Sequence, residues 1–167
     1  RIYKQNGITW EDHGQDQDIL IGSNGNERFG HAIALSADGT VLAAGGWKYS
    51  SSAKLVGVVR IYELINNKWV LQKERKGDYN RGYLGHTVAI SADGSTVAAG
   101  GWGGARDEVK NIEWKKNKGH SIVLRRDSDK KWQQLGDPFI GEAQGDRSGQ
   151  SVSLSKDGSI FAVGEIQ

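Results

Sequence analysis

The chain has 167 residues, a formal net charge of +2, 24 Gly, 1 Pro and neither Cys nor Met. This length suits one domain or a part of one, and the small charge excludes a strong general attraction to nucleic acid or to a membrane surface. The lack of Cys excludes disulfides and thiolate metal sites, and no apolar run is long enough to span a membrane.

The first predicted element is a β-hairpin over residues 1–15, with a turn at Asn6-Gly7 and a tryptophan in its second strand. Asn-Gly between alternating strands is a strong hairpin signal. We call this unit the Trp hairpin. It recurs twice, and seven positions separate the two markers in each of the pairs Tyr3 and Trp10, Tyr62 and Trp69, and Arg125 and Trp132.

A second unit, the Asp-Gly hairpin, alternates with the first and covers residues 29–47, 84–102 and 148–165. Each copy has a Gly, a short apolar run, an Asp-Gly turn and a run of small apolar residues. Gly accepts positive φ and Asp tolerates it, so the dipeptide predicts a tight turn. We expect strand pairs 31–35 with 41–44, 86–90 with 96–99 and, in a Trp hairpin, 58–63 with 68–71.

One hairpin of each kind makes a four-stranded unit, and its Asp-Gly turn recurs after 55 and then 64 residues. Four antiparallel strands at this period predict an all-β fold, a β-propeller segment rather than a solenoid, whose repeats are shorter. The predicted parts form one domain with two complete blades, 29–71 and 84–135, and two half-blades, 1–15 and 148–167.

The pattern Gly-His-x-x-Ala-x-Ser-Ala-Asp-Gly followed by Ala-x-Gly-Gly resembles the FG-GAP repeats of integrin α-type propellers. WD40 repeats are the alternative, but the WD dipeptide is absent. The FG-GAP resemblance implies a propeller fold and an extracellular or cell-surface location, and FG-GAP repeats often bind calcium through acidic loops. Each turn here offers a single Asp, whereas calcium takes six to eight oxygens, so we expect no metal and no cofactor.

The repeated polar positions are interpreted as structural, because a catalytic group does not normally recur in every repeat. The Asp residues suit turn formation, and His31 and His86 suit hydrogen bonds between neighbouring blades. The tryptophans of the Trp hairpins suit core packing. These structural positions are Gly30, His31, Asp38, Gly39, Gly85, His86, Asp93, Gly94, Gly149, Asp157, Gly158, Trp10, Trp69 and Trp132.

Two groups are candidate binding residues. Trp47 and Trp102 follow the inner strands, where a propeller loop opens near the axis, and either binding or packing fits them equally. Lys115, Lys116 and Lys118 close the longest loop and suit an acidic partner, although intervening acidic residues favour a solvated face.

The sequence contains no recognisable nucleophile–base arrangement and no phosphate-binding glycine loop. The leading hypothesis is a non-enzymatic interaction module for adhesion or scaffolding, or a subunit of a larger assembly. The alternatives are a glycan-binding, lectin-like propeller and a non-catalytic portion of a propeller enzyme. Partners would be other protein chains or missing blades, or else a glycan, but neither nucleic acid nor a membrane interior.

The chain does not begin with Met and starts inside a strand pattern, so we expect a processed chain or a fragment. Both terminal half-blades would leave strand edges and apolar faces uncovered, with Ile160, Phe161 and Val163 poorly covered at the second. We therefore expect additional polypeptide to cover them in a larger ring or assembly.

Overall fold

The structure is a computed structural model and describes residues 1–13, 20–23, 25–52, 54–104 and 117–166. In these ranges the regular elements are strands in antiparallel sheets, which confirms the all-β prediction. The strands are β1 (Tyr3–Asn6), β2 (Thr9–Asp12), β3 (Phe29–Leu35), β4 (Val41–Gly46), β5 (Ser50–Ser51), β6 (Lys54–Leu55), β7 (Val58–Ile65), β8 (Lys68–Lys76), β9 (Thr87–Ile90), β10 (Thr96–Gly101), β11 (His120–Arg126), β12 (Trp132–Gln134), β13 (Phe139–Ile140), β14 (Ser151–Leu154) and β15 (Phe161–Gly164).

The first sheet has the strand order β3-β4-β7-β8. The two predicted pairings in this segment are confirmed, β3 with β4 and β7 with β8. β4 is buried along its whole length, because its small residues have a strand on either side and another sheet across one face. β8 continues to Lys76, past the predicted end at residue 71, and the loop after β4 contains the short pair β5–β6, which we did not predict.

The second sheet has the order β12-β11-β10-β9, and β13 also pairs with β11. The predicted pairing of β9 with β10 is confirmed. Leu42 lies opposite Tyr62 in the first sheet as Val97 lies opposite Leu124 in the second. The seven-residue spacing aligns Arg125 with Tyr62, but the register makes Leu124 the equivalent residue, because the loop before Trp132 is longer.

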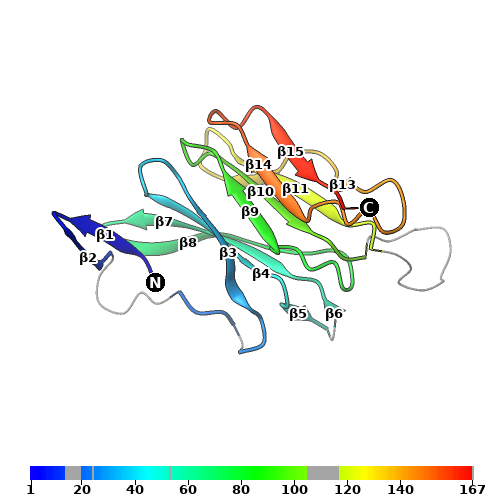
Figure 1. Cartoon of the computed structure of the whole chain (residues 1–167). Helices are drawn as coiled ribbons and strands as arrows, with labels where there is room; N and C mark the ends of the chain where they lie inside the picture. The colour runs from blue at the N-terminus through cyan, green and yellow to red at the C-terminus, as the bar shows by residue number, and fades with distance from the viewer. Residues whose placement is uncertain (14–19, 24, 53, 105–116, 167) are drawn as a thin grey trace.

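The two sheets and the hairpin β14–β15 are stacked, with β9 packed against both β3 and β14 (Figure 1). The same backbone bond joins successive Asp-Gly turns: Ala37 N donates to the Ala92 carbonyl, and Ala92 N donates to the Lys156 carbonyl, both at 2.8 Å. At Gly45, a Cβ would lie 2.0 Å from the Gly85 carbonyl oxygen, so glycine permits this close stacking.

One apolar core lies between the two sheets. Its buried members come from β4 and β7 on one side, from β10, β11 and β12 on the other, and from Leu84 in the connection before β9, with Val88 and Ile90 of β9 packed against them. The buried members are Val41, Ala43, Val59, Ile61, Leu84, Val97, Ala99, Ile122, Leu124 and Trp132. Because both sheets supply this core, neither sheet buries its apolar face alone.

The N-terminal hairpin β1–β2 packs at the other side of the first sheet, and β14–β15 lies at the opposite end of the stack (Figure 1). Ile2 packs with Tyr62 and Trp69, and Trp69 Nε1 donates to the His13 carbonyl at 3.3 Å. Trp10 departs from the expected core packing: it is 69% exposed, whereas Trp69 is 6% exposed. The reason is that no inner strand pair accompanies β1–β2 within the described residues.

Candidate functional site

Trp47 and Trp102, the predicted binding tryptophans, directly follow β4 and β10 and are half-buried. Tyr83 contacts both, with ring centroids 5.4 Å from Trp47 and 4.7 Å from Trp102. His86 contacts the same two rings edge-on, at 6.1 and 6.2 Å. These four residues and His31 form one group across both sheets, which we call the aromatic cluster.

Two cations lie over the tryptophan rings of the cluster. Lys48 Nζ is 4.9 Å from the ring centroid of Trp47, and the Arg147 guanidinium carbon is 6.0 Å from that of Trp102. Such contacts contribute about 0.5–1 kcal/mol at exposed positions. A sugar that stacked on these rings would compete with Tyr83, Lys48 or Arg147, so the cluster does not present two free stacking faces.

His31 and His86 contact each other through their rings, with centroids 5.0 Å apart. Nδ1 of His86 is buried and has no hydrogen-bond partner among the described residues, so the expected hydrogen bond between blades is not made by this atom. Burial, and to a lesser degree the neighbouring His31, lowers the pKa of His86 below its usual value. A neutral imidazole therefore packs in the aromatic cluster near neutral pH.

The three Asp-Gly turns share one hydrogen-bond pattern. In the second, the Asp93 carboxylate accepts from Ser91 Oγ at 2.6 Å, Ser95 N at 3.0 Å and Ser95 Oγ at 2.8 Å, and Ser91 Oγ accepts from Thr96 N. Asp38 and Asp157 repeat these contacts. The serine bonds are the main cause of a lowered carboxyl pKa, to about 2 for Asp157. These bonds occupy the carboxylates in closing the turns.

The predicted basic group is only partly described, because Lys115 and Lys116 lie outside the described residues. Lys118 is half-buried, and its Nζ donates to the Glu142 carbonyl at 3.0 Å. This lysine ties the loop before β11 to the segment after β13. The structure therefore gives Lys118 a local structural contact.

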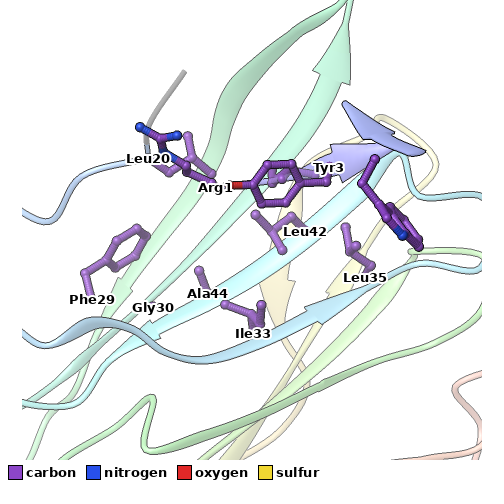
Figure 2. Close-up of a pocket in the computed structure, with 11 residues that line it drawn as sticks. Arg1, Tyr3, Leu20, Phe29, Gly30, Ile33, Leu35, Leu42 and Ala44 are labelled. Atoms are coloured by element: carbon purple, nitrogen blue, oxygen red, sulfur yellow. The ribbon is translucent and has the colours of Figure 1, made fainter. Parts of the chain in front are cut away.

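A groove of about 520 Å³ lies at the exposed side of the first sheet, and none of the predicted binding residues belongs to it. Figure 2 shows Ile33, Leu35 and Leu42 along β3 and β4 on one side of the groove and Tyr3 of β1 on the other. Trp10 also lines it. Ile33 is 62% exposed, which is high for a large apolar residue in a sheet.

The sequence does carry a signal for this groove. Ile33 and Leu35 occupy the repeat positions of Val88 and Ile90, which pack against the core between the sheets. The first sheet covers these positions in the second sheet, but no described sheet covers them in the first sheet. The apolar surface of the first sheet is therefore left exposed. We predicted uncovered apolar faces for both terminal half-blades but named side chains only at the second.

At the C-terminal hairpin β14–β15, Ile160 is 68% exposed. Phe161 and Val163 are half-buried, and the Phe161 ring lies 5.2 Å from that of Phe139. Along residues 160–163 the two sides of the chain therefore differ, with Ile160 and Ala162 exposed and Phe161 and Val163 partly covered.

Over the described ranges, no three His, Cys, Asp or Glu residues come together in a way that could hold a metal ion. A helix long and apolar enough to cross a membrane is also absent from the part of the chain that the structure describes.

Comparison with known proteins places the chain in no family. No family model matches it, and no curated protein matches it. Among solved structures, the chain is similar to a chain of hydrazine synthase from Kuenenia stuttgartiensis, with 12% sequence identity and a TM-score of 0.48. The match covers 78% of this chain and 35% of the other, so this chain spans about a third of that protein's length.

Proposed function

We propose that this chain is a propeller-type, non-enzymatic interaction module that binds other polypeptide through the groove between β1–β2 and the first sheet. The observation that carries the proposal is the apolar character of this exposed surface, where Ile33, Leu35 and Trp10 are each well exposed. Contiguous exposed apolar surface of this kind is typical of protein interaction sites.

The propeller part of the proposal is supported by the repetition of the sheets. Two successive antiparallel sheets have the same order of four main strands and equivalent registers, and they are linked by equivalent bonds at their Asp-Gly turns. Radially repeated four-stranded sheets are the architecture of propellers, which act in many systems as binding scaffolds.

The test compares the wild-type chain with an Ile33→Glu variant as bait in affinity purification, followed by binding of each recovered protein in purified form. A purified protein that binds the wild type and loses most of its affinity for Ile33→Glu would support the proposal. An Ile65→Glu bait is the matched control, because Ile65 is also exposed but lies at the far end of β7. Equal binding to all three baits would contradict the groove as the interaction surface.

The glycan hypothesis stays a separate prediction with its own test. A lectin should bind sugars on a glycan array and lose that binding when Trp47 and Trp102 are both replaced by Ala. The contacts of Tyr83, Lys48 and Arg147 with these rings favour the polypeptide-binding proposal over this one.

A further inference from the structure

The packing between the two sheets indicates what kind of surface the groove would bind. On the side of the second sheet, Val88 and Ile90 of β9 pack against the core. On the side of the first sheet, Val41 and Ala43 supply this core and are 5% and 0% exposed. One small-residue strand of a preceding sheet thus covers the β9–β10 surface of the following sheet.

The groove lies on the β3–β4 surface of the first sheet, which is equivalent to the β9–β10 surface of the second sheet. Among the described strands, none equivalent to β4 packs on this β3–β4 surface. The registers make Ile33 and Leu35 equivalent to Val88 and Ile90, because Leu35 lies opposite Leu42 as Ile90 lies opposite Val97. Ile33, Leu35 and Leu42 all line the groove. What is missing is a strand that carries the counterparts of Val41 and Ala43.

The chain carries those counterparts in β15 and in the residue just before it. Aligning the turn glycines Gly39 and Gly158 makes Ile160 equivalent to Val41 and Ala162 equivalent to Ala43. Ile160 is 68% exposed and Ala162 is also exposed, so both lack the neighbour that their equivalents have. The surface that the groove lacks is therefore present, uncovered, at the other end of the same chain.

The strand pairing is complementary as well. β4 pairs with β3 on one side and β7 on the other, whereas β15 pairs with β14 alone among the described strands. β1 is the equivalent of β7: Ile61 packs in the core with Leu124 and Trp132, and Ile2 packs in the same way with Tyr62 and Trp69. The hairpin β1–β2 is thus an outer strand pair without inner strands, and β14–β15 is an inner pair without outer strands.

The backbone at the groove leaves room for such a hairpin. A Cβ at Gly94 would lie 2.8 Å from Val41 Cγ2, and one at Gly85 would lie 2.2 Å from the Val58 carbonyl oxygen. At the equivalent positions Gly39 and Gly30, no atom lies within 4 Å.

We propose that the hairpin β14–β15 of a second copy of this chain docks in the groove and pairs with β1–β2, completing a four-stranded sheet between two copies. This inference rests on the proposed function, since it uses the same groove, and it names the partner as the chain itself. Such a head-to-tail contact uses different surfaces on the two copies.

The registers fix the expected contacts. Phe161 of one copy lies opposite Tyr3 of the other, as Leu42 lies opposite Tyr62. Lys156 N of the docked hairpin donates to the Ala37 carbonyl, as Ala92 N donates to the Lys156 carbonyl within one copy. Two copies that dock reciprocally would contain six sheets (three per copy), a number within the four to eight of closed propellers.

The first experiment measures the mass of the purified chain by sedimentation velocity and light scattering over a concentration series. The wild type is expected to form a dimer, and Ile33→Glu and Ile160→Glu are each expected to raise the dissociation constant by about 30-fold or more, as for a central interface anchor. Both side chains are exposed in a single copy, so these variants should keep its circular dichroism spectrum. Ile65→Glu is the control and should dimerise like the wild type.

The second experiment mixes the two variants. Ile33→Glu keeps an intact hairpin and Ile160→Glu keeps an intact groove, so an equimolar mixture should recover a heterodimer through one intact contact. A contact between identical surfaces would show no such recovery. Because the chain has no Cys, Tyr3→Cys and Phe161→Cys chains should also form a mixed disulfide, whereas Tyr3→Cys with Ile65→Cys should not.

A wild-type chain that stays monomeric throughout the series, or a dimer indifferent to both variants, overturns docking by a second copy. The monomeric result would be expected if the occupant were a hairpin of other polypeptide. The proposed function is decided separately, by whether a different purified protein binds the wild type but not Ile33→Glu.

Discussion

At the scale of single residues, the first sheet contains a buried ion-pair network that no repeat position predicts. Glu27 is fully buried and pairs with Arg60, and Arg60 Nε also contacts Glu74 Oε2 at 2.7 Å. Ser23 donates its backbone NH to Glu27 Oε2 at 2.6 Å. The second sheet has Ile122 at the position of Arg60, so this network is not repeated there.

Replacing Arg60 with Met should destabilise the chain by about 3–5 kcal/mol, because it leaves the Glu27 carboxylate buried without its cation. Arg126→Met is the matched control: its pair with Glu63 at 3.0 Å is partly exposed, and its loss should cost about 1 kcal/mol or less. Urea unfolding measures both. Similar losses for the two variants would contradict the dominant role of burial.

His120 is a second residue whose environment only the fold reveals. It is 1% exposed and contacts Tyr79 edge-on at 4.9 Å, and neither ring nitrogen has a hydrogen-bond partner among the described residues. Burial lowers the pKa of His120 to about 4. An unfolded histidine titrates near 6.5, so the unfolded chain binds a proton between these values that the folded chain does not.

The contribution of His120 to stability is therefore complete above about pH 6.5 and is lost as the pH falls towards 4. Its size is about 3 kcal/mol over the whole window. We expect the free energy of unfolding of the wild type to fall more steeply than that of His120→Gln between pH 7 and 4, in urea titrations at each pH. Parallel profiles would show that His120 does not cause the acid sensitivity.

At the scale of elements, turn chemistry allowed the hairpins to be predicted. Asp38-Gly39 and Asp93-Gly94 specify a tight turn locally, and the apolar runs beside them have strand character, so β3–β4 and β9–β10 follow from sequence. The pairs β5–β6 and β11–β13 lack such a signal, because they are two residues long and depend on the neighbouring chain. The sequence predicted the two tryptophans and the two histidines of the aromatic cluster for separate roles and did not predict Tyr83, since the contacts that join these residues cross between sheets.

Gly94→Ala should destabilise the chain more than Gly39→Ala, although both glycines have φ of 71° and the same turn. The positive φ costs an alanine roughly 1–2 kcal/mol at either position. A Cβ at residue 94 also meets Val41 Cγ2 at 2.8 Å, which should add about 1–3 kcal/mol of overpacking. Thermal and urea unfolding of the two variants provide the comparison, and equal losses would argue against close contact between successive turns.

At the scale of the whole molecule, the two sheets share one core and should unfold together. Ile122 of β11 is 1% exposed and lies in that core with Val41 and Ile61 of the first sheet. Stacked repeats derive much of their stability from such neighbour interfaces.

Ile122→Ala should remove about 2–5 kcal/mol of stability by leaving a cavity between the sheets. In native-state hydrogen exchange, the protection of amides in β4 should fall by the same amount as that of amides in β10. Loss of protection confined to β10 and β11 would show that the first sheet is stable without the second.

The sequence by itself determined the hairpins of this protein, because turn geometry and the alternation of apolar residues act over a few neighbouring positions. Burial was decided by the tertiary structure. Trp10 and Trp69 occupy the same position in the same hairpin, yet one is exposed and the other is buried. Ile33 is likewise 62% exposed, whereas its equivalent Val88 is partly buried against the core between the sheets. The physical reason is that burial depends on whether a neighbouring sheet covers the surface, and residues distant in the chain supply that sheet.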